Sequence, residues 1–402
     1  MRSSRSPHLL ALLVVVGACG GAPSQPTFPT RPTPAIPADD LATAKGSAKS
    51  VDAGDPRLAV GVKDPRVVDL DIIRIRATPI GVGGDPEMSS VATADLFRLA
   101  NEAAKAGQTK DAIGRYRQII TEFPDSQYAP VSLFNIAAIY DGQGDLSSTI
   151  TTLRELVGGY PNARESIEGH MYIAALQAEH RQFPEAADTL AAVLVRPNLT
   201  FADRVEANAR RGYVLLELKK YDEADAMLLA AVAEWRRATR IDDPYYIAMA
   251  NYYRGELAHR KFAEAPVRLP DDQLVADLET KRVLAVEAYD RWKESLSYNH
   301  AYWGTAAGYQ MSQIFVELWE VTVKAPYPPR LAVSARPRYI VELHDRVRGH
   351  LEKALQGHRM NLELAKAYGV GTTWSKGSEQ SAVQVMQLLA QDTPGHFVTP
   401  AN

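Results

Sequence analysis

Residues able to carry out acid–base or metal chemistry are few and scattered in this chain of 402 residues. None of the nine histidines lies four residues from another, the spacing that puts two zinc ligands on one helix face. The sequence also has no Gly-x-Ser-x-Gly turn for a nucleophile and no Gly-rich phosphate loop before a helix. The histidines are therefore expected at the surface or in a groove. No catalytic residue, metal ion or cofactor is predicted, and a catalytic site built from residues distant in sequence stays open.

Two acidic pairs, Asp242-Asp243 and Asp271-Asp272, are candidate carboxylate sites. Each pair stands directly before a segment with helical periodicity. Carboxylates at that place stabilise the positive end of the helix dipole. Helix capping is the favoured interpretation, and calcium binding or acid–base catalysis is the alternative.

The only cysteine, Cys19, follows a short N-terminal segment with its own character. Arg2 and Arg5 precede an apolar run over residues 9–16, and small residues lead up to the cysteine. This order is typical of a secretory signal, and the run is well short of the ~20 apolar residues that cross a bilayer. A single cysteine also excludes an intramolecular disulfide and a zinc site built from cysteines.

The tetrapeptide ending at Cys19, Val-Gly-Ala-Cys, resembles the lipobox of bacterial lipoproteins. In that family the cysteine sulfur receives a diacylglycerol and the signal is cut just before it. The resemblance implies a signal peptide over residues 1–18, lipidation at Cys19 and a membrane anchor of acyl chains. Gly20, where Asp would favour inner-membrane retention, points to the outer membrane and its periplasmic face. The alternative is an ordinary signal peptide with an incidental cysteine.

Residues 19–90 have the composition of a tether. Eleven of the 25 prolines lie in the first 90 residues, which hold only one aromatic residue, Phe28. Such a stretch cannot bury enough apolar surface to offset its ordering entropy, so we expect a disordered, lipidated tether. Residues 67–76 partly alternate apolar and charged residues, which predicts a short strand. That strand would pack on the body of the protein or join the sheet of another protein.

A repeat begins at residue 91. A small residue recurs at Ala100, Ala137, Ala174 and Gly212, in steps of 37, 37 and 38 residues. Large apolar residues surround each one at helical spacing, as where two helices approach closely. These offsets resemble the tetratricopeptide repeat (TPR). The step, with FPDS and YPNA at the junctions, resembles periplasmic TPR lipoproteins of barrel-assembly and Tol-Pal type systems.

The repeat loosens after residue 240, where Gly255 and Gly308 mark a fifth and a sixth first helix. We expect repeats over residues 91–322, then a loop and C-terminal capping helices over 323–402. Helical periodicity in the last part spans about 339–368 and 379–389. The predicted fold is all-α: a TPR-like solenoid of helical hairpins with a helical cap, preceded by a disordered tether.

In TPR proteins the first helix of each pair lines a concave groove. The register of the repeat then predicts which side chains face a partner. Glu256 and Arg260, four apart on one helix, should share a face and partly pair with each other. The predicted groove residues are Phe97, Asn101, Lys105, Phe134, Asp141, Met171, Glu179, Tyr213, Glu217, Tyr252, Glu256, His259, Arg260, Tyr302, Tyr309 and Gln313.

Aromatic residues concentrate in the C-terminal part, because all five tryptophans and 11 of the 18 tyrosines follow residue 234. They either pack irregular helix pairs or form a binding surface. A mixed aromatic and polar groove suits an extended peptide or a helix better than a small molecule.

The resemblance therefore implies a lipid-anchored scaffold of the outer membrane, facing the periplasm. It would bind other envelope proteins through peptide or helix segments in barrel assembly, pilus or secretin biogenesis, gliding motility or Tol-Pal function. A net charge of -3 and a pI near 6.3 argue against nucleic acid as a partner. No small-molecule substrate is expected. The alternative is an envelope enzyme, such as a peptidoglycan hydrolase, carried on helical repeats.

Overall fold

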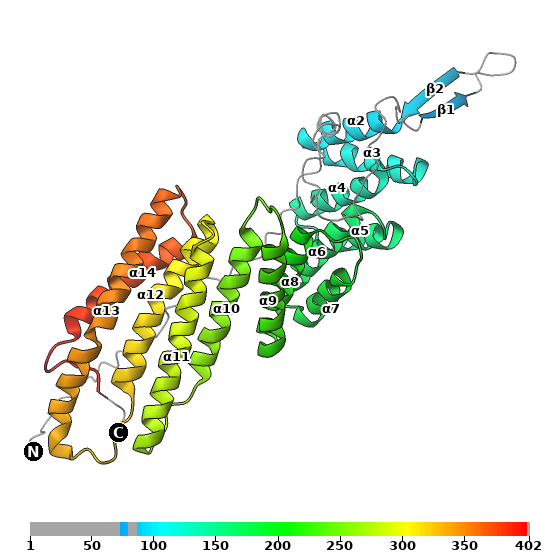
Figure 1. The fold of residues 1–402 in the computed structure, drawn as a ribbon. Coiled ribbons are helices and arrows are strands. Elements are labelled where there is room, and N and C mark those ends of the chain that lie inside the picture. The colour runs from blue at the N-terminus through cyan, green and yellow to red at the C-terminus, as the bar shows by residue number, and fades with distance from the viewer. Residues whose placement is uncertain (1–72, 79–86, 400–402) are drawn as a thin grey trace, which may run out of the picture.

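The computed structural model describes residues 73–78 and 87–399, which form one strand hairpin followed by a long stack of helices (Figure 1). Residues 1–18, Cys19 and most of the expected tether lie outside the described residues. Within the described part, no helix is both long and apolar enough to span a membrane.

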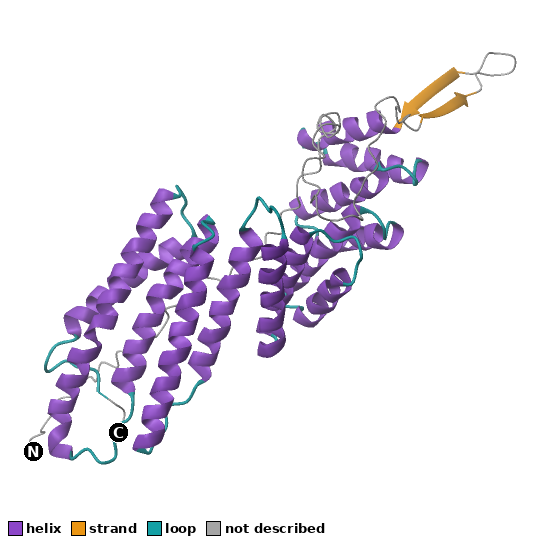
Figure 2. Ribbon diagram, in the orientation of Figure 1, coloured by secondary structure: helices purple, strands orange, loops and turns teal. Residues whose placement is uncertain are grey.

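The hairpin pairs β1 (Ile73–Thr78) with β2 (Glu87–Ala92) in antiparallel register, Ile73 opposite Ala92. β1 overlaps the strand expected over 67–76, whose residues 67–72 lie outside the described residues. Its partner was not foreseen: it is the segment just before the first helix, neither the helical body nor another protein. Nearby segments pair at a small loop-closure cost, which explains this choice. Figure 2 shows the hairpin at the N-terminal end of the stack.

Eight helices of 12 to 17 residues form the first four antiparallel pairs. The pairs are α2 (Thr93–Lys105) with α3 (Thr109–Glu122), α4 (Tyr128–Gly142) with α5 (Leu146–Gly159), α6 (Arg164–Glu179) with α7 (Phe183–Leu194), and α8 (Phe201–Glu217) with α9 (Tyr221–Arg237). The recurrent small residues are all buried. A Cβ atom on Gly212 would lie 2.5 Å from Leu228 of α9. These positions are therefore where paired helices approach most closely.

Longer helices continue the stack. They are α10 (Tyr245–Glu264), α11 (Asp271–Leu296), α12 (Ala301–Lys324), α13 (Arg336–Ala367) and α14 (Thr373–Gln391), with a short 3₁₀ turn, η2 (Val333–Ala335), before α13. α10 pairs with α11, and α12 with α13. α13, expected within the cap, is thus also the second helix of a sixth pair, and α14 packs on both α12 and α13.

Glycines set the close approaches of these long helices. A Cβ on Gly255 of α10 would lie 2.4 Å from Trp292 of α11, and one on Gly308 of α12 would lie 2.3 Å from Asn361 of α13. Both glycines were expected to mark first helices, and they do. Their missing side chains leave room for a large partner residue.

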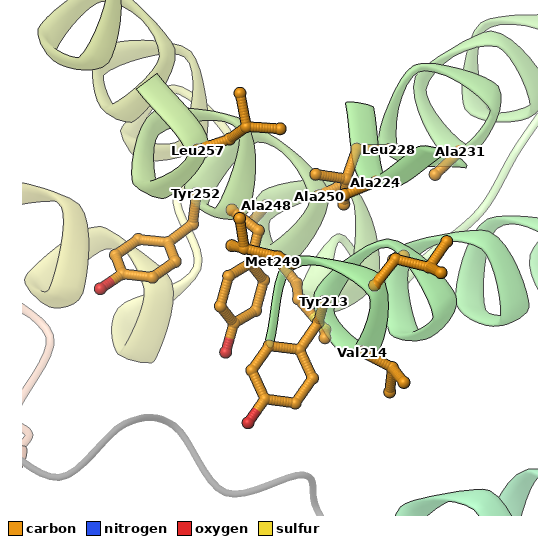
Figure 3. Packing of buried hydrophobic residues seen from close by; sticks show 14 of the residues in the cluster. Tyr213, Val214, Ala224, Leu228, Ala231, Ala248, Met249, Ala250, Tyr252 and Leu257 are labelled. Atoms are coloured by element: carbon orange, nitrogen blue, oxygen red, sulfur yellow. The ribbon is translucent and has the colours of Figure 1, made fainter. Parts of the chain in front are cut away.

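One apolar cluster joins the regular repeats to the long helices. Figure 3 shows Tyr213 and Val214 of α8, Leu228 of α9 and Met249 of α10 within it. Trp292, Trp303 and Trp374 belong to the same cluster, and Trp319 is buried in another. Packing is therefore the role of these four tryptophans.

Candidate functional site

The stack has two unlike faces, set by how its helices contact one another. At four of the five steps along the stack, the first helices of consecutive pairs touch directly: α2 touches α4, α4 touches α6, α8 touches α10, and α10 touches α12. α6 and α8 make no contact of this extent. Consecutive second helices (α3, α5, α7, α9, α11 and α13, all within the described residues) make no contacts of similar extent. At these four steps the first-helix side is therefore the closer-packed side of the stack, and we call it the inner face.

Seven of the predicted groove residues lie in the core instead of on that inner face. These buried residues are Phe97, Asn101, Phe134, Met171, Tyr213, Tyr252 and Tyr309. Seven others are half-buried, namely Asp141, Glu217, Glu256, His259, Arg260, Tyr302 and Gln313. Only Lys105 and Glu179 are exposed.

The aromatic members of the buried set fill the seams between helices. The ring of Phe134 on α4 lies 6.4 Å from that of Tyr172 on α6, and Tyr213 on α8 lies 4.7 Å from Tyr253 on α10. Large rings at this register reach sideways to the next first helix. These side chains hold consecutive repeats together and offer little surface to a partner, which corrects the expectation that they face the groove.

Asn101 has a structural partner as well. Its Oδ1 accepts a hydrogen bond from the Tyr116 hydroxyl at 2.5 Å, and Asn135 donates to the same hydroxyl at 3.2 Å. Burial raises the pKa of Tyr116 to about 12, so its hydroxyl keeps its proton. Asn101 therefore satisfies a buried polar group of the first two repeats.

Charged residues that are half-buried, together with the buried amide of Gln310, link three first helices across the inner face. Arg260 of α10 donates to Glu217 of α8, and Gln310 of α12 donates to Glu256 of α10 at 2.8 Å. Glu256 and Arg260 thus bond to residues of neighbouring helices, contrary to the mutual pairing expected from their spacing. Packing of α8 and α12 against α10 brings these partners within hydrogen-bond distance.

His259 of α10 completes this set through a 2.7 Å contact with Glu317 of α12. Burial lowers the pKa of His259, but the hydrogen bond and charge of Glu317 outweigh it, so the pKa lies above its ordinary value. Burial raises the pKa of Glu256. The cluster is arranged to hold helices together, and no serine, threonine or cysteine nucleophile contacts His259 among the described residues.

The surface left for a partner on the inner face is acidic towards the ends of α4 and α6. Burial raises the pKa of Tyr172, and the nearby carboxylates of Asp141 and Glu179 raise it further. Neither carboxylate forms an ion pair with any described residue. Together with Lys105 on α2, these side chains are the predicted groove residues best placed to meet a partner.

Two histidines are buried in the C-terminal part, where surface or groove positions were expected. His344 of α13 contacts Asp392 through Nδ1 and the carbonyl of Val398 through Nε2 at 2.9 Å. Arg348 donates to the Asp392 carbonyl at 3.0 Å. These contacts fasten the C-terminal tail to α13, and they could not be found from sequence because Asp392 is 48 residues from His344.

His358 is fully buried beside Ser378 and Tyr309. Burial lowers its pKa to about 4, so the imidazole is neutral. Among the described residues, no group of three or more His, Cys, Asp or Glu could hold a metal ion.

The acidic pairs lie at helix starts, but the N-cap residues of α10 and α11 are Pro244 and Pro270. Asp243 accepts a hydrogen bond from the backbone of Tyr245 at 2.9 Å, and Asp271 and Asp272 lie in the first turn of α11, where their charge favours the helix dipole.

A groove of about 560 Å³ between α11 and α13 was missed by the sequence analysis. It lies among second helices, whereas the expected groove lay among first helices. Its lining residues form no sequence motif, and the apolar and polar pattern of α13 alone predicts an ordinary amphipathic helix. No sequence signal could have found it, because it exists only through the spacing of two helices.

Residues 87–242 match a family model described as a tetratricopeptide repeat-like domain. Among solved structures, a tetratricopeptide repeat protein from Parabacteroides merdae ATCC 43184 is 13% identical to this chain, with a TM-score of 0.34. The match covers 74% of this chain and 98% of the other. The TPR domain of P58(IPK) is 12% identical with the same coverages and a TM-score of 0.24. No curated protein matches the chain. β2 to α9 form a TPR-like domain, and the predicted all-α solenoid is confirmed.

Proposed function

We propose that this protein is a lipid-anchored scaffold of the outer membrane that binds other envelope proteins on the periplasmic side. It would act in the assembly or operation of an envelope machine, without a reaction of its own. The TPR-like stack is suited to protein–protein interaction. The observation that carries the proposal is the inner face formed by the first helices, with charged residues at its edge that form no ion pair among the described residues.

The anchor is the part of the proposal that rests on the N-terminal sequence. Residues 1–18 have the order of a signal peptide, and Cys19 stands where lipoproteins carry their acyl chains. Each buried methylene contributes about 0.8 kcal/mol, so two or three chains hold a protein firmly on a membrane. No other strong anchor is visible in the sequence.

Cys19→Ser tests the anchor. The variant should move from the membrane to the soluble fraction and should no longer incorporate radioactive palmitate. A serine variant that stays as membrane-bound as the parent would contradict lipidation at this residue.

Charge reversal on the inner face tests partner binding. Glu179→Lys should reduce the recovery of crosslinked partners from intact cells, because this exposed carboxylate borders the face and has no ion-pair partner among the described residues. Asp188→Lys, at an exposed site on the second helix α7, is the matched control. Equal loss with both variants, or no loss with either, would contradict binding at the inner face.

A further inference from the structure

The groove lies between the second helices α11 and α13, with α12 as its floor. Figure 1 shows α12 running between α11 and α13. α12 packs against both flanking helices, which have little direct contact with each other. The side chains around the groove come from all three helices. They are Tyr289 and Leu296 of α11, Gly308, Met311, Ser312 and Phe315 of α12, and Lys353, Gln356, Gly357, Met360, Asn361 and Leu364 of α13.

Two glycine contacts explain why the groove forms here. Gly357 of α13 sits so close to Ser312 of α12 that a Cβ would lie 2.5 Å from its hydroxyl oxygen, and Gly308 faces Asn361 in the same way. α13 is therefore drawn tightly onto α12. The outer space between α13 and α11 stays unfilled, because no helix of the described chain follows α13 on that side.

The chemistry of the groove is apolar with one charge. Two methionines, two aromatic residues and two leucines make up half of its lining residues, and Met360 is 64% exposed. Methionine adapts to varied partners and is frequent on helix-binding surfaces. Lys353 is the only charged lining residue. Its ammonium lies 5.7 Å from the centre of the Phe315 ring, and it pairs with no carboxylate among residues 73–78 and 87–399.

The shape of the groove sets the form of its occupant. The lining positions of α13 run from Lys353 to Leu364, which is about 16 Å, or three turns, at ~1.5 Å per residue. An amphipathic helix lies in such a groove with apolar anchors at i, i+4 and i+7. Lys353, Gln356 and Met360 of α13 are all exposed, so the groove is open along this side, as a helix requires and an enclosed acyl chain does not.

We propose that this groove docks an amphipathic helix of a partner protein, with an acidic residue beside its apolar stripe placed to meet Lys353. The apolar stripe covers Met360 and the other apolar residues, and the carboxylate supplies the counter-charge that Lys353 lacks. This second docking surface lies on the face opposite the first helices. It depends neither on the lipid anchor nor on partner binding at the inner face, so it extends the scaffold role by a separate site.

A binding experiment with two designed peptides tests the proposal. Both peptides are labelled helices of about five turns with leucines at i, i+4 and i+7; one carries glutamates beside the leucines and the other lysines. Fluorescence anisotropy is measured with the full chain. The acidic peptide should bind the parent, and the basic peptide should bind more weakly by about tenfold or more.

Variants of exposed residues locate the binding. Met360→Glu should lower the affinity for the acidic peptide by about tenfold or more, since the apolar stripe of the peptide loses its contact with the methionine. Lys353→Glu should reverse the preference, so that the basic peptide binds better. Val195→Glu replaces another exposed apolar residue, 82% exposed at the end of α7, and should change nothing. All three variants should melt at the temperature of the parent.

Four results would overturn the proposal. The first is a lack of selectivity, seen either as equal binding of both peptides by the parent or as equal effects of Met360→Glu and Val195→Glu on binding. The second is displacement of the acidic peptide by laurate, which would assign the groove to an acyl chain. The third is a dimer of the parent that Met360→Glu dissolves in sedimentation, which would assign it to a second copy. The fourth is a crosslink from position 360 to residues 20–72, which would assign it to the chain's own N-terminal segment.

Discussion

The first four helix pairs and the long helices after them pack in different ways. Helices of residues 93–237 have 12 to 17 residues and meet at three alanines and one glycine spaced almost evenly. Helices of residues 245–391 have 19 to 32 residues and meet where a glycine receives a tryptophan or an asparagine. The long helices also bury the polar side chains of His344, His358 and Asn361.

The difference shows how far each region depends on distant residues. A small apolar contact repeated every 37 residues can be made by any neighbouring pair of the same kind, so the first region is built from local rules. A buried imidazole or amide needs one specific partner, because an unsatisfied polar group in the core costs roughly 1–3 kcal/mol. The first region has such partners in Asn101 and Asn135, both bonded to Tyr116, and the second has them at His344, His358 and Asn361. Without an even repeat, the second region depends more on such specific partners.

The two regions can be followed separately. Four of the five tryptophans lie in the second region and the fifth, Trp235, lies near the end of α9, so tryptophan fluorescence reports mainly the second region. Circular dichroism reports the helices of both. A change confined to one region should therefore shift the two signals by different amounts.

Acid should weaken the second region most. His358 binds a proton only below about pH 4 in the folded protein, whereas an unfolded histidine binds it below ~6.5. Stability from the neutral imidazole is complete above ~6.5 and is lost as the pH falls towards 4. The gap between the folded and unfolded pKa values corresponds to a loss of up to ~3 kcal/mol in the free energy of unfolding. Urea unfolding followed by fluorescence near pH 7 and near pH 4.5 measures this loss.

His358→Asn should remove most of that acid loss, although it lowers stability at neutral pH. His180→Asn, at an exposed site in the first region, should retain the acid loss of the parent. If His358→Asn and the parent lost the same stability between the two pH values, another group would be responsible.

Adding one methyl group tests the glycine contacts of the long helices. Gly255→Ala should destabilise the protein by ~1–3 kcal/mol, because the new Cβ would lie within 2.4 Å of the buried Trp292 ring. Gly349→Ala on α13 is the control, since a Cβ there meets nothing within 4 Å. That control should gain ~0.5–1 kcal/mol from the better helix former. Thermal unfolding followed by fluorescence distinguishes the two variants. An unchanged stability of Gly255→Ala would mean that the Trp292 ring moves aside without cost.

The smallest expected effect is at the turns of the first region. Gly107, Gly144, Arg181 and Lys219 occupy equivalent turns with φ of 73°, 74°, 59° and 59°. Gly144→Ala should cost ~1 kcal/mol, since a side chain is strained at positive φ, while a Cβ there touches nothing.

Lys219→Gly should raise the free energy of unfolding, because it relieves the same backbone strain. It loses only an exposed 3.5 Å ion pair with Glu264. Urea unfolding followed by circular dichroism is the measurement. A loss of stability in Lys219→Gly would show that the turn conformation carries no strain.

Much of the fold could be predicted because its evidence is local. The small residues from Ala100 to Gly308 mark six first helices, and a sequence repeat records them directly. The inner-face residues were predicted less well, since the register gives a direction but not the distance to the next helix. Phe134 and Tyr213 point along the expected side, yet they reach Tyr172 and Tyr253 and are covered by them.

The sequence by itself determined the period of the repeat, the order of the helices and the N-terminal pattern around Cys19, because each depends on residues within a few turns of one another. Only the tertiary structure decided that β1 pairs with β2, that Arg260 bonds to Glu217, that His344 fastens the tail and that α11 and α13 leave a groove. These features join residues up to tens of positions apart. Their partners are selected by where helices cross, and the crossing is fixed by packing of the whole stack.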